Sequence, residues 1–241
     1  MRASFDGTGD VIAVTGGANG ISRAVAEAAA DAGAAVAVLD VAERPVDLPD
    51  AIAYHRVDVS ERDALREAAA ELNSELGPVT GLVCGAVIQP RSGVLEMDPE
   101  QWRRVQAVNL DGVVWTCQAF VPQMVDAGGG AVVVFTSGIA TSGWPRASAY
   151  STTKAAAQGL ARSLAAEVAD DRVRVNLISP GVVDTPQYRA ANDEADRRHW
   201  ADTIGVGEVE DVVGPVLFLL SDAATMTGSL LTRERAFRRE P

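Results

Sequence analysis

The sequence is poor in cysteine and histidine, the side chains most used for zinc sites and for nucleophilic triads. It has two of each in 241 residues, and Cys84 and Cys117 form no CxxC pair. His55 and His199 lie far apart along the chain. This scarcity argues against a disulfide framework, a zinc centre and a Ser-His-Asp triad, so we expect reduced thiols and no metal site.

Positive charge and long apolar runs are scarce as well. The chain has 33 acidic and 21 basic residues and a formal net charge of −12, which would repel a nucleic acid backbone. No apolar run approaches the roughly 20 residues of a membrane span. The first residues also lack the basic and apolar pattern of a secretory signal. We therefore expect a cytoplasmic protein that binds neither nucleic acid nor membrane.

What the chain does contain is a regular alternation of short apolar runs and helical patterns. Buried strands are predicted at 11–15, 34–39, 51–57, 81–84, 131–136 and 173–178, with a further strand after residue 228. Helices are predicted at 20–32, 61–76, 99–125, 149–169 and 209–220. The alternation indicates an α/β fold, a doubly wound parallel sheet (Rossmann fold) of six or seven strands with helices on both faces. We expect one domain over residues 1–241.

A glycine-rich turn follows the first predicted strand. Glycines such as Gly16 and Gly20 let the backbone approach a pyrophosphate, and the next helix offers unpaired N–H groups. Asp40 ends the second strand, where a carboxylate can bind both ribose hydroxyls and repel a 2′-phosphate. This favours NAD over NADP, although Arg44 nearby could favour NADP. Asp58, at the end of the third strand, could bind the adenine amino group or simply cap a turn.

Tyr150 and Lys154 are four residues apart in a predicted helix and therefore share one face. A phenol with a pKa near 10 is a poor base at neutral pH. A cation about 4 Å away is worth roughly 4 kcal/mol at an effective dielectric constant of 20, so Lys154 is expected to lower the pKa of Tyr150. Burial opposes this effect. The pair thus indicates general acid–base chemistry.

With these motifs in place, the chain resembles the main, roughly 250-residue branch of the short-chain dehydrogenase/reductase family. The resemblance covers nearly the whole chain. It is carried in the family's order and spacing by the glycine turn, Asp40, Asp58, Val59, Asn109, Ser137, Tyr150, Lys154, Pro180, Gly181 and Thr185.

The resemblance implies a role for each of these residues. Ser137 would bind the substrate oxygen, Tyr150 would transfer its proton, Lys154 would also hold the nicotinamide ribose, and Asn109 would hold a relay water. The expected cofactor-binding residues are Gly16, Asn19, Gly20, Ile21, Asp40, Asp58, Val59, Gly85, Tyr150, Lys154, Pro180, Gly181, Val183 and Thr185.

The sequence departs from the family in three places. Ser22 replaces the last glycine of the turn, and residues 84–87 read Cys-Gly-Ala-Val where the family has Asn-Asn-Ala-Gly. The loss of both amides should remove hydrogen bonds at that strand end. The end of the chain is charged where the family packs against a partner subunit. A homodimer or a homotetramer is expected, and the tetramer is the less secure of the two.

We therefore expect an NAD-dependent enzyme that interconverts a small secondary alcohol and a ketone. Two alternatives stay open: a non-catalytic or regulatory dinucleotide-binding protein on the same fold, and an NADP-dependent ketone reductase. Residues 186–204 lie where the family has its substrate lid. Trp144 could line the substrate pocket or pack in the core.

Overall fold

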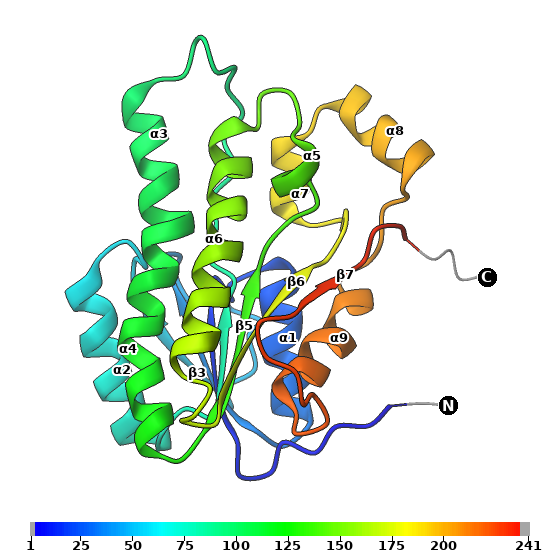
Figure 1. Cartoon of the computed structure of the whole chain (residues 1–241). Coiled ribbons are helices and arrows are strands. Elements are labelled where there is room, and N and C mark those ends of the chain that lie inside the picture. The colour runs from blue at the N-terminus through cyan, green and yellow to red at the C-terminus, as the bar shows by residue number, and fades with distance from the viewer. Residues whose placement is uncertain (1–2, 237–241) are drawn as a thin grey trace.

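Seven parallel strands form one twisted sheet in the computed structural model, which describes residues 3–236 (Figure 1). The strand order is β3-β2-β1-β4-β5-β6-β7. The strands are β1 Val11–Thr15, β2 Ala35–Asp40, β3 Ile52–Arg56, β4 Gly81–Cys84, β5 Gly130–Phe135, β6 Val173–Ser179 and β7 Leu230–Thr232. The doubly wound parallel sheet is confirmed, with seven strands.

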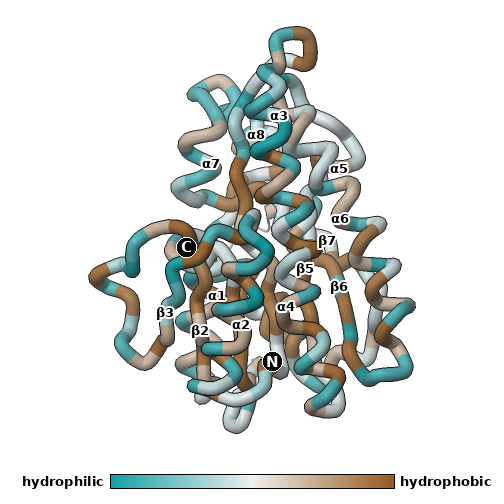
Figure 2. The backbone as a smooth tube through the Cα atoms, turned by 90° about the vertical axis from the view of Figure 1, so that its left-hand side faces the viewer, coloured by the Kyte–Doolittle hydropathy of each residue, from teal (hydrophilic) through white to brown (hydrophobic). Residues whose placement is uncertain are grey.

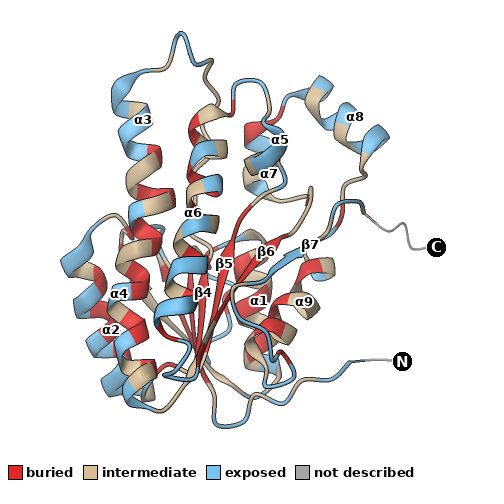
Figure 3. Ribbon diagram, in the orientation of Figure 1, coloured by how far each residue is buried: buried red, intermediate tan, exposed pale blue. Residues whose placement is uncertain are grey.

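Helices cover both faces of the sheet (Figure 1). On one face lie α2 Arg62–Leu76, α4 Gly112–Asp126 and α6 Ser148–Glu167; on the other lie α1 Gly20–Asp31 and α9 Glu210–Leu220. Each face holds its own apolar core, and the central strands are buried throughout (Figure 3). This explains their continuous apolar sequence, because alternation is expected only where one face of a strand meets water. Within residues 3–236, no helix is both long and apolar enough to span a membrane.

The helix predicted over 99–125 is interrupted. It consists of α3 Pro99–Gln106, a π-helical turn at Ala107–Asp111, and α4. Asp98 caps α3 by accepting a hydrogen bond from the Gln101 N–H. A π turn occupies a single turn of the helix, which is too short to give a sequence period of its own.

Three short helices stand beyond the carboxyl ends of the strands (Figure 1). They are α5 Ile139–Ser142, α7 Pro186–Ala191 and α8 Glu194–Thr203. The last two occupy the region expected to hold the lid, with Thr185 and Asp193 as their N-caps. The chain leaves β1 and β4 in opposite directions, which opens a crevice at this edge of the sheet.

The C-terminal strand forms in spite of its charged exit. β7 pairs with β6 at the edge of the sheet, and both leucines of β7 are exposed. The backbone tube in Figure 2 shows the apolar strands surrounded by more polar helices and loops. The departure noted at the end of the chain continues into residues 237–241, which lie outside the described residues.

Candidate active site

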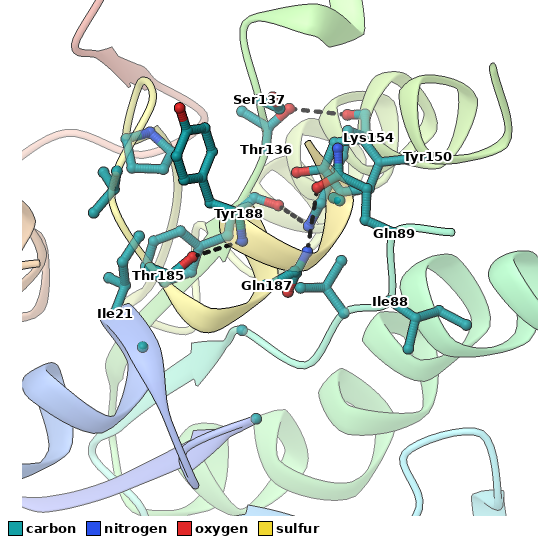
Figure 4. A pocket seen from close by; sticks show the side chains of 18 of the residues that line it. Ile21, Ile88, Gln89, Thr136, Ser137, Tyr150, Lys154, Thr185, Gln187 and Tyr188 are labelled. Atoms are coloured by element: carbon teal, nitrogen blue, oxygen red, sulfur yellow. Dashed lines mark hydrogen bonds between the residues drawn. The ribbon is translucent and has the colours of Figure 1, made fainter. Parts of the chain in front are cut away.

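A cavity of about 1350 Å³ opens at the carboxyl ends of the strands. Ligand pockets commonly measure about 300–1000 Å³, so the space suits a dinucleotide together with a small substrate. Every expected catalytic or cofactor-binding residue lines this cavity, except Asn109. Figure 4 shows the end of the cavity that holds Ser137, Tyr150 and Lys154, with Thr185, Gln187 and Tyr188 beside them.

The glycine turn is shaped for the close approach of a ligand. Gly16 has a φ of +71°, and a Cβ there would lie 2.6 Å from the Ala86 Cα atom. No side chain caps the first turn of α1, and that turn carries no acidic residue. Its amide groups and the positive end of the helix dipole therefore suit a phosphate group.

Asp40 is fixed at the same end of the cavity. One carboxylate oxygen accepts the Ala18 N–H at 2.9 Å and the other accepts the Ala42 N–H at 3.0 Å. Each oxygen keeps a lone pair for a further donor. The guanidinium of Arg44 donates to the carbonyls of Ile52 and Pro49 at 2.8 and 2.9 Å, so it supports the neighbouring loop.

Asp58 also lines the cavity, but its carboxylate already has protein partners. It accepts hydrogen bonds from Ser60 at 2.7 Å and from Arg104 at 2.7 Å. Burial raises the pKa of Asp58, but these bonds outweigh burial and hold the pKa below its usual value. The structure thus shows the turn-capping arrangement, and an adenine amino group would have to share these oxygens.

Two departures from the family pattern fit each other. A Cβ on Gly85 would lie 2.1 Å from the Ser22 hydroxyl oxygen, so the side chain of Ser22 fills the space that Gly85 leaves. The Thr15 hydroxyl accepts the N–H groups of Gly85 and Ala86 at 3.1 and 3.4 Å. These bonds connect the end of β4 to β1.

The three residues expected to carry chemistry meet at the other end of the cavity. Tyr150 hydrogen-bonds with Ser137. The Lys154 ammonium lies 5.8 Å from the centroid of the Tyr150 ring and donates to the Phe135 carbonyl at 2.7 Å. The Thr136 hydroxyl donates to the Lys154 carbonyl at 2.9 Å, which fixes α6 against the end of β5.

The electrostatics of this group differ from the expectation. Burial raises the pKa of Tyr150, and the groups that oppose it are Ser137, through its hydrogen bond, and Arg91, through its charge. Lys154 does not contribute to the lowering, because burial reduces its own pKa to about 8 and its ammonium is directed at a backbone carbonyl. Protein groups alone therefore keep Tyr150 in its neutral form at neutral pH.

The buried ammonium of Lys154 destabilises the folded protein, and a substitution should reveal this effect. Burial lowers the pKa of Lys154 in the folded protein to about 8, from its ordinary value of 10.5, so folding disfavours its charged form. The penalty is complete below pH 8 and fades as the pH rises toward 10.5. Lys154→Met should therefore raise the free energy of unfolding at pH 7 by about 3 kcal/mol, less about 1 kcal/mol for the lost hydrogen bond to the Phe135 carbonyl.

Thermal unfolding at pH 7 and at pH 10 measures this effect. The melting temperature of Lys154→Met should exceed that of the unaltered protein at pH 7, and the difference should shrink at pH 10. Lys154→Arg serves as the control, since its side chain stays charged at both pH values. An equal difference at both pH values would contradict the assignment.

Asn109 lies behind the cavity wall, in the π turn, and is fully buried. Its amide accepts the Ile88 N–H at 2.9 Å and donates to the Ile88 carbonyl at 2.8 Å. It also donates to the Thr153 hydroxyl at 3.3 Å. Both amide hydrogens are therefore used, and Asn109 fixes the segment that follows β4 against α6.

Several cavity residues were not named individually from the sequence, although Gln187 and Asn192 fall within the predicted lid segment. Gln89 and Gln187 are joined by a 3.4 Å hydrogen bond, and Arg91 and Asn192 by one of 2.8 Å. Arg233, from the charged C-terminal segment, donates to Asp211 at 3.0 Å and to the Pro180 carbonyl at 3.3 Å. All lie in loops or at helix ends, where neither periodicity nor a motif marks them.

Trp144 packs against the lid region instead of lining the cavity. Its ring centroid lies 5.0 Å from that of His199 and 4.2 Å from that of Trp200. Of these three side chains, only Trp200 lines the cavity. The cluster therefore joins the loop after β5 to α8.

Comparison with known proteins agrees with this geometry. A family model described as short chain dehydrogenase matches residues 10–196. The chain is 35% identical to a probable galactose dehydrogenase of Rhizobium meliloti, covering 91% of each chain. It is 36% identical to cis-4-hydroxycyclohexanecarboxylate dehydrogenase of Sinomonas cyclohexanicum, over 92% of this chain and 93% of that one. The structure of a gluconate 5-dehydrogenase from Burkholderia cenocepacia in complex with NADP and tartrate matches with a TM-score of 0.89 and 28% identity, over 95% of each chain.

Proposed function

Since the chain belongs to the short-chain dehydrogenase/reductase family, we propose that it is an NAD-dependent oxidoreductase that interconverts a secondary alcohol and a ketone. The observation that carries the proposal is the position of Tyr150, hydrogen-bonded with Ser137 and next to Lys154, at one end of a cavity whose other end is the glycine turn. The family binds nicotinamide dinucleotides; the preference for NAD and the role of Tyr150 are our proposals.

Different residues along the cavity bind different parts of the cofactor. The turn at Gly16 and Gly20 and the N-terminus of α1 bind the pyrophosphate, and Asp40 binds the adenosine ribose. Asn19, Ile21, Val59 and Gly85 line the path between, and Pro180, Gly181, Val183 and Thr185 enclose the nicotinamide. The nicotinamide, when bound, supplies the hydride acceptor or donor.

Proton transfer is the task of the residues on α6 and at the end of β5. Ser137 donates a hydrogen bond to the substrate oxygen, and Tyr150 accepts its proton during oxidation or returns one during reduction. The protein alone leaves the pKa of Tyr150 raised, so additional positive charge must lower it during turnover. The oxidised nicotinamide is the proposed source, and Lys154 holds the nicotinamide ribose.

Asn109 does not contact the substrate in this proposal and acts through a bound water. Its amide orients the Ile88 carbonyl, and the remaining lone pair of its oxygen can hold the relay water. We propose that this water exchanges the proton of Tyr150 with solvent through Lys154.

The choice of NAD is supported by two side chains. The fixed carboxylate of Asp40 would meet a 2′-phosphate directly, and like charges at close range repel. Arg44 would be the natural partner of that phosphate, but it is bound to loop carbonyls. The bound NADP in the related gluconate 5-dehydrogenase makes this a point to be tested.

A screen of secondary alcohols tests the proposal. The relatives named above suggest sugars and ring hydroxy acids, so the panel should include galactose, cyclohexanol and 4-hydroxycyclohexanecarboxylate. NAD reduction followed by absorbance is expected with at least one member. If no alcohol reduces NAD or NADP and no ketone oxidises NADH, the proposed activity is wrong.

The wider organisation is also proposed. We infer one domain over residues 1–241, a cytoplasmic location and a homodimer or homotetramer. The exposed leucines of β7 and the open face of α6 at Gly159 offer surfaces for a second copy. Light scattering after size exclusion would measure the number of copies, and a monomer would contradict the inference.

A further inference from the structure

Arg91 is a cavity residue that the proposed chemistry does not use. It lies in the segment between β4 and α3, five residues after Ala86. Its Nε donates to the Ala191 carbonyl at 2.8 Å and its Nη2 to the Asn192 side-chain oxygen at 2.8 Å. These bonds bring the guanidinium to the junction of α7 and α8, above the substrate end of the cavity.

Arg91 lines the same cavity as Tyr150 and Ser137. The positive charge of its guanidinium lowers the pKa of the Tyr150 phenol. A ligand held by Tyr150 and Ser137 therefore experiences the charge of this cation. Asp196 attracts the guanidinium and Arg146 repels it through their charges.

Within residues 3–236, Arg91 differs from the other arginines that line the cavity in forming no ion pair with a carboxylate. Arg104 is paired with Asp58 at 2.7 Å and Arg233 with Asp211 at 3.0 Å. No such ion pair forms at Arg91, and its Nη1 is enclosed without any hydrogen-bond acceptor among the described residues. An enclosed, unpaired donor on a charged group is costly, so this arrangement is expected where a ligand supplies the missing acceptor.

Holding the lid region does not by itself account for an arginine. The two acceptors of Arg91, a backbone carbonyl and an amide oxygen, are neutral, and a neutral donor would bind them without burying a charge. A guanidinium is, however, the side chain suited to bidentate binding of a carboxylate.

We propose that Arg91 binds an anionic group of the substrate, so that the enzyme acts on a hydroxy acid and its keto acid. The proposal rests on the alcohol–ketone activity proposed above and narrows its substrate class. A carboxylate would approach the guanidinium while the carbinol oxygen lies between Tyr150 and Ser137. Sugars and other neutral alcohols lack this group and would leave Arg91 unpaired.

Matched acid and amide substrates test the proposal by turnover. The probes are 3-hydroxybutanoate, 4-hydroxypentanoate and cis-4-hydroxycyclohexanecarboxylate, each beside its carboxamide, because the spacing of carbinol and carboxylate is to be found by experiment. The best acid should exceed its amide in kcat/KM. Arg91→Gln should raise the KM for that acid by about 10- to 100-fold and change the KM for the amide little.

Two further variants separate charge from positioning. Arg91→Lys keeps the charge and should retain part of the preference for the acid. Arg197→Gln is the matched control, because it removes one exposed arginine of α8 that does not line the cavity. It should leave the preference unchanged. An equal loss for acid and amide in Arg91→Gln would show that Arg91 only positions the lid region, and would overturn the proposal.

Binding gives a readout that does not need turnover. Calorimetric titration of the NADH-loaded protein should show tighter binding of cyclohexanecarboxylate than of cyclohexanecarboxamide, and Arg91→Gln should abolish the difference. If neutral alcohols are oxidised and neither acids nor this carboxylate are preferred, the inference about Arg91 is wrong while the proposed function stands. If no alcohol is oxidised, the proposed function fails, and the same titration, repeated without NADH, decides whether Arg91 forms an anion site.

Discussion

Tyr150→Phe is expected to lower kcat for alcohol oxidation by about 1000-fold or more, with little effect on NADH binding. The change removes one oxygen atom and with it the group proposed to accept the proton, a contribution that commonly amounts to 10²–10⁴-fold. The ring stays in place beside Lys154, so the walls of the cavity are preserved. Steady-state kinetics and NADH fluorescence titration measure the two quantities separately.

Tyr54→Phe is the matched control for this experiment. It removes the same atom from a tyrosine outside the cavity, whose hydroxyl donates to the Ala42 carbonyl at 2.9 Å. Its kcat should stay within about twofold of that of the unaltered protein. If Tyr150→Phe keeps most of the activity, the proposed mechanism is wrong. That result would favour a dinucleotide-binding protein without this chemistry.

The second large effect is expected at Asp40. The unaltered protein should use NAD in preference to NADP, and Asp40→Ser should lower the ratio of the two kcat/KM values by about 100-fold. Two unit charges about 4 Å apart repel by about 4 kcal/mol at an effective dielectric constant of 20. Solvent screening at this partly exposed position reduces that figure, and each 1.4 kcal/mol corresponds to a factor of ten.

The ratio is the right measurement because Asp40 also supports the glycine turn. Loss of its bonds to the Ala18 and Ala42 N–H groups should weaken binding of both cofactors, and the ratio cancels this shared effect. Glu43→Ser is the control, since it removes a neighbouring carboxylate that does not line the cavity. An unaltered protein that prefers NADP would contradict the assignment of Asp40.

Regular elements were predictable because local sequence carries their signal. Continuous apolar runs matched the buried strands, and the helices predicted over 20–32 and 61–76 end next to Gly33 and Gly77, which have positive φ. The π turn at 107–111 and the short helix α5 were missed, because one inserted residue or four helical residues leave no periodicity. The sequence predicted that Lys154 lowers the pKa of Tyr150, and the structure does not show this effect. Burial of Lys154 is the reason, and burial depends on the complete fold.

Among site residues, those in motifs were predictable and those in loops were not. The glycine turn, Asp40 and the Tyr150–Lys154 pair have fixed spacing, and the fold brings them to one cavity. The contact of Arg91 with Asn192 joins positions 101 residues apart, and nothing local marks either residue. The complementarity of Ser22 and Gly85 likewise became visible only when the two were in contact.

The sequence by itself determined the parallel α/β sheet, the position of the glycine turn and the motif residues that follow the strands. Tertiary structure alone decided which charges in the cavity are paired, because pairing depends on contacts between distant segments. It shows Arg44 bound to loop carbonyls, Asp58 bound to Arg104, and Arg91 without a carboxylate partner among the described residues.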